Sequence, residues 1–191
     1  MIENIVVKLV DQMVEENLIS RDDSEHYEYA MVTLAERMLT IGTLLIIGLI
    51  CGNCVFTLCF LGAFLSLRKR TGGYHTEYFW QCYLLTIGSY VIATRLAVVF
   101  LAKPMLMYLF LTGAVIVIEI IGTVNHPNMD MDEDELREAK KAARLVTLLE
   151  LLVIGIFVAL EIDKIYVASM SIAIISCAFS LCIAKIIKQE V

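Results

Sequence analysis

A chain of 191 residues with 59% hydrophobic and only 19% charged residues carries more apolar surface than a soluble core of that size buries. Its mean hydropathy is +0.78 and its apolar residues form long runs, which predicts a membrane protein whose backbone is satisfied by helices. The net charge of −6 argues against nucleic acid as a partner.

The first predicted element is an amphipathic helix over residues 1–20. Apolar side chains such as Val6, Leu9 and Met13 recur close to helical spacing, opposite acidic and amide side chains. Such a helix lies on the membrane surface, or it packs on the cytoplasmic side of its own bundle or of a second copy. The segment lacks the basic start, compact apolar core and cleavage site of a signal peptide, so none is expected.

Six apolar runs then predict six spanning helices within one membrane domain, residues 1–191. The expected spans are 30–51, 53–67, 78–102, 105–123, 145–161 and 165–184. A polar segment, 124–144, separates the fourth span from the fifth and is expected on the cytoplasmic side. The predicted fold class is all-α: a polytopic integral membrane protein with about six transmembrane helices and an N-terminal amphipathic helix.

Lysines and arginines set the expected orientation. With both termini in the cytoplasm, the outer side receives only Lys103 and Lys164, and the other basic side chains outside the spans lie inside. The reverse orientation inverts this distribution, so the positive-inside rule predicts a multi-pass protein of the cell membrane with cytoplasmic termini.

The six cysteines do not predict a disulfide framework. Four of them, Cys51, Cys59, Cys177 and Cys182, lie in or beside apolar runs, where a free cysteine packs as a small hydrophobe. Cys51 also forms a C-x-x-C with Cys54, but no second pair or histidine lies near it. We expect no metal and no other cofactor.

The most unusual segment is 68–82, which reads R-K-R-T-G-G-Y-H-T-E-Y-F-W-Q-C between the second and third spans. The paired glycines Gly72 and Gly73 permit backbone conformations that other residues resist. His75 and Cys82 follow at the cytoplasmic interface. A histidine that takes the proton and a thiolate that attacks a carbonyl are the minimum for thiol nucleophilic catalysis.

A straight helix cannot bring His75 to Cys82. Seven residues rise about 10.5 Å along a helix, whereas proton transfer needs about 3 Å. We therefore expect a bend at the paired glycines, with Cys82 in the first turns of the third span, where the helix dipole and the adjacent basic residues favour a thiolate. A contact between two subunits is an alternative. On spacing alone, a packing Cys82 and an interfacial His75 are the favoured interpretation.

This segment resembles the signature of the accessory gene regulator B (AgrB) family, quorum-sensing peptidases of Gram-positive bacteria. Arg68, Gly73, His75 and Cys82 match the arginine, glycine, histidine and cysteine of the family pattern. The polar loop with Asn125, Pro127 and Asn128 also resembles the family's, although it continues N-M-D where N-K-P is commoner.

The resemblance implies an activity. Family members cut the C-terminal tail from a short precursor peptide, AgrD, and close the new C-terminus as a thiolactone or lactone. His75 would deprotonate Cys82, and the resulting acyl-enzyme thioester would be attacked by the precursor's own nucleophile. The expected partners are an AgrD-like peptide, the lipid bilayer and, by resemblance, a second copy in a homodimer.

Other residues of the segment have candidate supporting roles. Arg68, Lys69 and Arg70 would hold an acidic precursor tail, or Lys69 and Arg70 serve only as positive-inside anchors. Glu77 would orient His75, or it is an exposed interfacial carboxylate. Gln81 would donate to an oxyanion.

Two other classes of protein compete with the peptidase. A small transporter or peptide exporter would use Glu36, Arg95 and Glu119 as pathway residues, and a scaffold would use none of them. Arg95 and Glu119 are costly in lipid, so we expect them to face the bundle interior or water. We place both nearer the outer ends of their spans, most simply as an ion pair.

Overall fold

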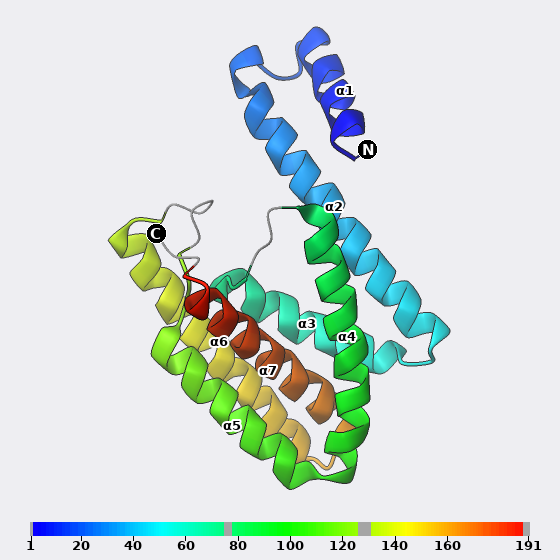
Figure 1. Ribbon diagram of the computed structural model, residues 1–191, viewed down its shortest axis with the longest axis vertical. Coiled ribbons are helices and arrows are strands. Elements are labelled where there is room, and N and C mark those ends of the chain that lie inside the picture. The colour runs from blue at the N-terminus through cyan, green and yellow to red at the C-terminus, as the bar shows by residue number, and fades with distance from the viewer. Residues whose placement is uncertain (1, 75–77, 126–130, 189–191) are drawn as a thin grey trace. The chain divides into compact units, whose positions relative to one another are not determined.

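The computed structural model is all-helical and describes residues 2–74, 78–125 and 131–188 (Figure 1). This confirms the expected fold class. A short 3-10 turn, Arg21–Asp23, precedes the second helix. The α-helices of the described residues are α1 Ile2–Glu15, α2 Ser24–Ile50, α3 Cys54–Thr71, α4 Phe79–Ala102, α5 Pro104–Ile121, α6 Glu133–Ala159 and α7 Lys164–Ile186.

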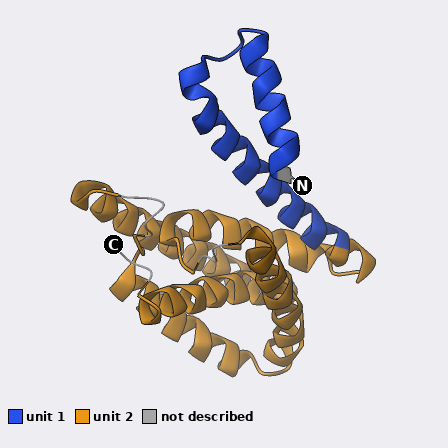
Figure 2. Cartoon of the chain, turned by 45° about the horizontal axis from the view of Figure 1, so that its top comes forward, with its two compact units in different colours: residues 1–46 blue, residues 47–191 orange. Residues whose placement is uncertain are grey.

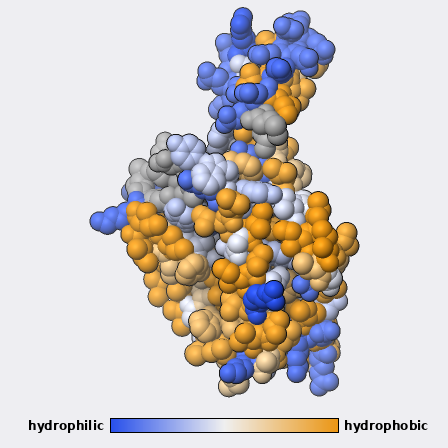
Figure 3. All heavy atoms as spheres, turned by 45° about the vertical axis from the view of Figure 1, so that its right-hand side comes forward, coloured by the Kyte–Doolittle hydropathy of each residue, from blue (hydrophilic) through white to orange (hydrophobic). Residues whose placement is uncertain are grey.

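Helices α2 to α7 correspond one to one to the six expected spans. Within the described residues, five of them are long and apolar enough to cross a membrane by length and composition: α2, α4, α5, α6 and α7. Helix α3 falls short because Arg68, Lys69 and Arg70 occupy its last turn. The outer face of the bundle suits a lipid solvent, since Leu84, Leu109 and other large apolar side chains are exposed (Figure 3).

The chain divides into two compact units, residues 1–46 and residues 47–191 (Figure 2). The first unit contains α1 and most of α2. Val6 and Val10 on α1 are buried, whereas Ile5 and Leu9 are exposed. The apolar face of the amphipathic helix is therefore only partly covered within the chain.

The second unit is built around α7, which packs against α3, α4, α5 and α6. Of the apolar stretch of α7, 61% is buried, against 22% for α4, α5 and α6. Small side chains on α7, among them Ala168, Ser171 and Ala178, are buried. Small residues let helix backbones approach closely where lipid offers no hydrophobic driving force, which explains why α7 is the central helix.

Helix α6 joins two parts that the sequence treats separately. It begins with a capping box, in which Asp132 accepts from the backbone N–H of Asp134 and Glu135 and Glu135 accepts from the backbone N–H of Asp132. It then runs without interruption from Glu133 to Ala159, because no proline breaks it. The basic end of segment 124–144 thus continues directly into the fifth span.

Candidate active site

The helix is interrupted between α3 and α4, as expected. Helix α3 ends at Thr71 and α4 begins at Phe79, and residues 72–74 have no regular structure. Cys82 is the fourth residue of α4 and is half-buried. The expected site residues His75 and Glu77 lie outside the described residues. The structure thus shows the break that a thiol–imidazole pair in one chain requires.

Both glycines at the break are required by geometry. Gly72 has φ 64° and Gly73 has φ 120°, values that side chains with a Cβ rarely adopt. A Cβ on Gly72 would lie 3.1 Å from the Val124 carbonyl oxygen, and one on Gly73 would overlap the Arg68 guanidinium and the Ser180 hydroxyl. The backbone at Gly72 and Gly73 therefore lies in close contact with its neighbours at the point where the chain leaves α3.

Arg68 holds this turn from inside. Its Nη1 donates to the Gly72 carbonyl at 2.5 Å and to the Ser180 hydroxyl at 2.6 Å, and its Nη2 donates to the Tyr74 carbonyl at 2.6 Å. Hydrogen bonds from a charged donor are short and strong. Three acceptors within the chain therefore fix the guanidinium and the two carbonyls that lead up to His75.

Arg68 carries its charge in a largely desolvated position. Burial lowers the pKa of its guanidinium from the ordinary value, and Cys177 and Cys82 act in the opposite direction. An arginine stays protonated under these conditions. Its three acceptors therefore hold a positive charge at the turn.

Ser180, on α7, is a site residue that the sequence does not reveal. It accepts from Arg68, and the Tyr74 backbone N–H points at both its carbonyl oxygen (3.3 Å) and its hydroxyl (3.2 Å). A serine in an apolar span most often bonds to its own helix, as Ser176 does to Ile172. Only the fold places Ser180 beside a segment 106 residues earlier in the chain.

A second connection anchors the end of α3 to the segment after α5. The Thr123 hydroxyl donates to the Arg70 carbonyl at 2.9 Å, and the Val124 N–H donates to the Thr71 carbonyl at 3.1 Å. The Arg70 side chain itself is exposed. The last carbonyls of a helix have no partner within it, so these bonds both satisfy α3 and fix the point where the chain leaves this helix.

Asn125 fixes the ends of the polar loop. Its amide nitrogen donates to the Met131 carbonyl at 2.9 Å, and its amide oxygen accepts from the Met131 N–H at 3.1 Å. Pro127 and Asn128 lie outside the described residues. Asn125 thus closes the loop that leads into α6.

A groove of about 590 Å³ runs along α4. Its lining consists of Tyr74, which precedes the helix, and one face of α4: Trp80, Gln81, Leu84, Leu85, Gly88, Ser89 and Ile92. Gln81, an expected supporting residue, lies at the end of the groove next to Cys82.

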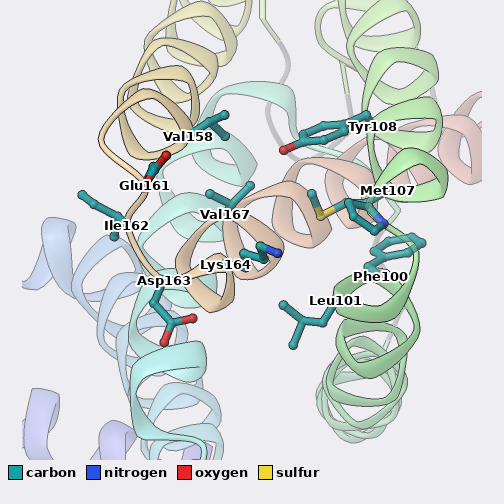
Figure 4. Close-up of a pocket in the computed structure, with 11 residues that line it drawn as sticks. Phe100, Leu101, Met107, Tyr108, Val158, Glu161, Ile162, Asp163, Lys164 and Val167 are labelled. Atoms are coloured by element: carbon teal, nitrogen blue, oxygen red, sulfur yellow. The ribbon is translucent and has the colours of Figure 1, made fainter.

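A larger cavity, of about 670 Å³, lies at the other end of α4 (Figure 4). It is lined by residues around the α4–α5 and α6–α7 turns, and the Lys164 side chain points into it beside Met107. Leu101 in its wall is nineteen residues beyond Cys82, or about 28 Å along a helix. This cavity therefore cannot serve chemistry at Cys82.

The expected pairing of Arg95 with Glu119 is wrong. Glu119 lies near the end of α5, just before the Thr123 and Val124 contacts to α3, so it is at the Cys82 end of the bundle rather than the outer end. Its Oε2 is 3.8 Å from the Nε of Arg144 on α6. Arg95 is exposed on α4. Glu119 lies at this end because α5 runs opposite to α4, from Lys103 back towards the end of the bundle that holds Cys82.

All six cysteines are free thiols in the structure. Among the residues that the structure describes, no group of histidine, cysteine and carboxylate side chains is placed to hold a metal ion.

Comparison with known proteins gives one result that covers nearly the whole chain. No curated protein matches the sequence, and no solved structure matches it. The family model for accessory gene regulator B matches residues 3–181, a range that includes the segment 68–82, the polar loop after α5 and Ser180. The chain therefore belongs to the accessory gene regulator B (AgrB) family.

Proposed function

We propose that this protein is a membrane-embedded cysteine endopeptidase that removes the C-terminal tail of an AgrD-like precursor and cyclises the product to a thiolactone or lactone signal. Family membership supports a role in the accessory gene regulator quorum-sensing system, with an AgrD peptide as substrate. The observation that carries the finer proposal is the fixed turn before His75. Arg68 and Ser180 hold Gly72 and Tyr74 where α3 gives way to α4, and Cys82 stands in the first turn of α4.

The proposed reaction has two halves. His75 takes the proton from the Cys82 thiol, and the thiolate attacks the scissile carbonyl. The C–N bond then breaks, His75 returns the proton to the leaving amine, and the tail departs from a thioester on Cys82. In the second half, a thiol or hydroxyl within the peptide loses its proton to His75 and attacks the thioester. The ring closes, and the Cys82 thiolate is released and takes up the proton.

The surrounding groups suit this sequence of steps. The N-terminal end of α4 carries a partial positive charge that favours negative charge on sulfur. The thioester preserves the acyl energy that hydrolysis would dissipate, so ring closure needs no nucleotide if water is kept away. In this proposal Gln81 donates to the oxyanion and Glu77 orients His75.

The basic residues divide into two roles. Arg68 is a positioning residue, because its guanidinium is committed to acceptors within the chain. Lys69 and Arg70 have exposed side chains and are the ones available to an acidic precursor tail. We propose, as the family suggests, that the enzyme acts as a homodimer in the bacterial cell membrane with both termini in the cytoplasm.

The direct test is co-expression with the AgrD peptide encoded beside the gene. Cys82→Ser and His75→Ala are each expected to abolish tail removal while the protein still inserts into the membrane. Mass spectrometry of the wild type should find an acyl adduct on Cys82. Cys59→Ser is the matched control, because Cys59 lies on α3 and not on the first turn of α4.

Two outcomes would contradict the proposal. Tail removal by Cys82→Ser would exclude a thiol nucleophile. If both variants process and release peptide normally while Arg95→Ala or Glu119→Ala does not, the protein is an exporter instead.

A further inference from the structure

The groove beside Cys82 has no role in the mechanism above. Resting on the proposed peptidase function, we infer that this groove is the subsite for the acyl side of the peptide. It binds the apolar residues that immediately precede the cleaved bond, the part of the precursor that is retained and cyclised.

One glycine leaves open space in the wall of the groove. Gln81, Leu84, Leu85, Gly88 and Ile92 recur every three to four residues and so share one face of α4. Gly88 lies between the larger side chains, and a Cβ built on it would meet no atom within 4 Å. The space over Gly88 is therefore open, and a larger residue there would fill the groove without displacing any part of the chain.

The lining fits an apolar peptide segment rather than a charged one. Trp80, Leu84 and Ile92 are 59%, 57% and 61% exposed, and they lie along the groove that begins near Gln81, the neighbour of Cys82 in the chain. Among the residues that the structure describes, no charged side chain lines the groove. Gln81 and Ser89 supply donors and acceptors to a peptide backbone.

One end of the groove is fixed by the catalytic segment itself. Tyr74, whose backbone is held by Arg68 and Ser180, forms part of the lining, and Cys82 follows Gln81. The groove thus begins at residues that are next to Cys82 in the chain. This position favours the peptide as occupant over a lipid chain, which would cover any exposed apolar face equally.

Charge gives the direction of the bound peptide. The groove leads from Cys82 along α4, whereas the exposed side chains of Lys69 and Arg70 lie at the end of α3. An acidic tail belongs with the basic residues, which leaves the apolar acyl segment for the groove. This segment must stay bound after the tail departs, because ring closure depends on holding the internal nucleophile near the thioester.

The test fills the groove at Gly88. Gly88→Leu is expected to raise the KM for tail removal about tenfold or more, because the leucine occupies the space in which the substrate would bury apolar surface. Its kcat should change by less than about threefold, and alkylation of Cys82 by iodoacetamide should proceed at the wild-type rate. Gly113→Leu is the matched control, because Gly113 is an exposed helical glycine on α5 with equally open space and lies outside the groove.

A crosslink tests occupancy without relying on catalysis. In a Cys82→Ala protein, a benzophenone amino acid in place of Ile92 should capture the AgrD peptide encoded beside the gene. The same group in place of Ile116, which is similarly exposed on α5, should not.

The outcomes separate the two proposals. If Cys82→Ser abolishes tail removal but Gly88→Leu has the same KM as Gly113→Leu, the groove inference is wrong and the peptidase stands. Capture of lipid alone at position 92 likewise overturns the groove inference. Tail removal by Cys82→Ser instead overturns the peptidase, whatever Gly88→Leu does.

Discussion

Arg68, Ser180 and the backbone of Gly72 to Tyr74 form one hydrogen-bonded cluster, in which each member fixes another. A buried guanidinium needs its donors satisfied, because desolvating them without partners is costly. The carbonyls of the turn supply those acceptors. The same bonds that stabilise the arginine therefore set the path of the chain into His75.

Ser180→Ala tests the cluster at its least obvious member. The variant removes one acceptor of Arg68 and one of the Tyr74 N–H while leaving the Ser180 carbonyl in place. We expect kcat for tail removal to fall by about tenfold to a hundredfold through misplacement of the segment, with little change in KM. Steady-state kinetics on purified protein in detergent or nanodiscs measures both constants.

The control for this prediction lies one turn earlier on α7. Ser176→Ala removes a hydroxyl that donates only to the Ile172 carbonyl at 2.8 Å, and it should keep wild-type kinetics. Ser180→Thr keeps the hydroxyl and should recover most of the activity. Equal losses in Ser176→Ala and Ser180→Ala would show that the effect is general destabilisation of α7.

Residues of the site differ in how far the sequence reveals them. The role of Cys82 as a thiol nucleophile stays a prediction. The paired glycines could be predicted, because a positive φ strongly favours glycine. Ser180 could not, since a serine in an apolar helix has an acceptor on its own helix. The ion pair between Glu119 and Arg144 could not be predicted either, since spacing along the chain does not determine which basic side chain faces Glu119.

At the scale of helices, side chains of α3 and α4 contact each other at a distance from the turn at Gly72 and Gly73. The hydroxyls of Thr57 and Tyr90 lie 2.5 Å apart, and both residues are almost fully buried. The Tyr90 ring also packs edge-on against Phe60 and tilted against Phe56. This contact sets the spacing of the two helices whose ends form the site.

Tyr90→Phe separates the hydrogen bond from the aromatic packing. The ring contacts remain, and Thr57 keeps its bond to the Asn53 carbonyl at 2.8 Å, so we expect a loss of about 1 kcal/mol in unfolding free energy. Titration with SDS from mixed micelles, followed by circular dichroism, measures it. Tyr108→Phe is the control, because Tyr108 is 38% exposed. An unchanged midpoint for Tyr90→Phe would show that the buried pair contributes nothing.

For the whole molecule, hydropathy predicts the helices but not their packing. The six expected spans correspond to the helices α2 to α7, and all of these except α3 are long and apolar enough to cross a bilayer. The central place of α7 could not be predicted, since every span is similarly apolar and the difference lies in small residues that matter only once a partner is chosen. Helix α6 could not be predicted as one continuous helix, because its first half is polar and resembles a segment separate from the fifth span.

Orientation is the property of the whole molecule on which the chemistry depends. With both termini inside, Cys51 and Cys54, which are exposed at the α2–α3 turn, face the outside of the cell. In a variant that keeps only these two cysteines, a membrane-impermeant maleimide should label intact cells. An Arg70→Cys variant that lacks the native cysteines should react only after permeabilisation, because residue 70 ends α3 on the other side. The reverse labelling pattern would place Cys82 outside the cell, away from a precursor made in the cytoplasm.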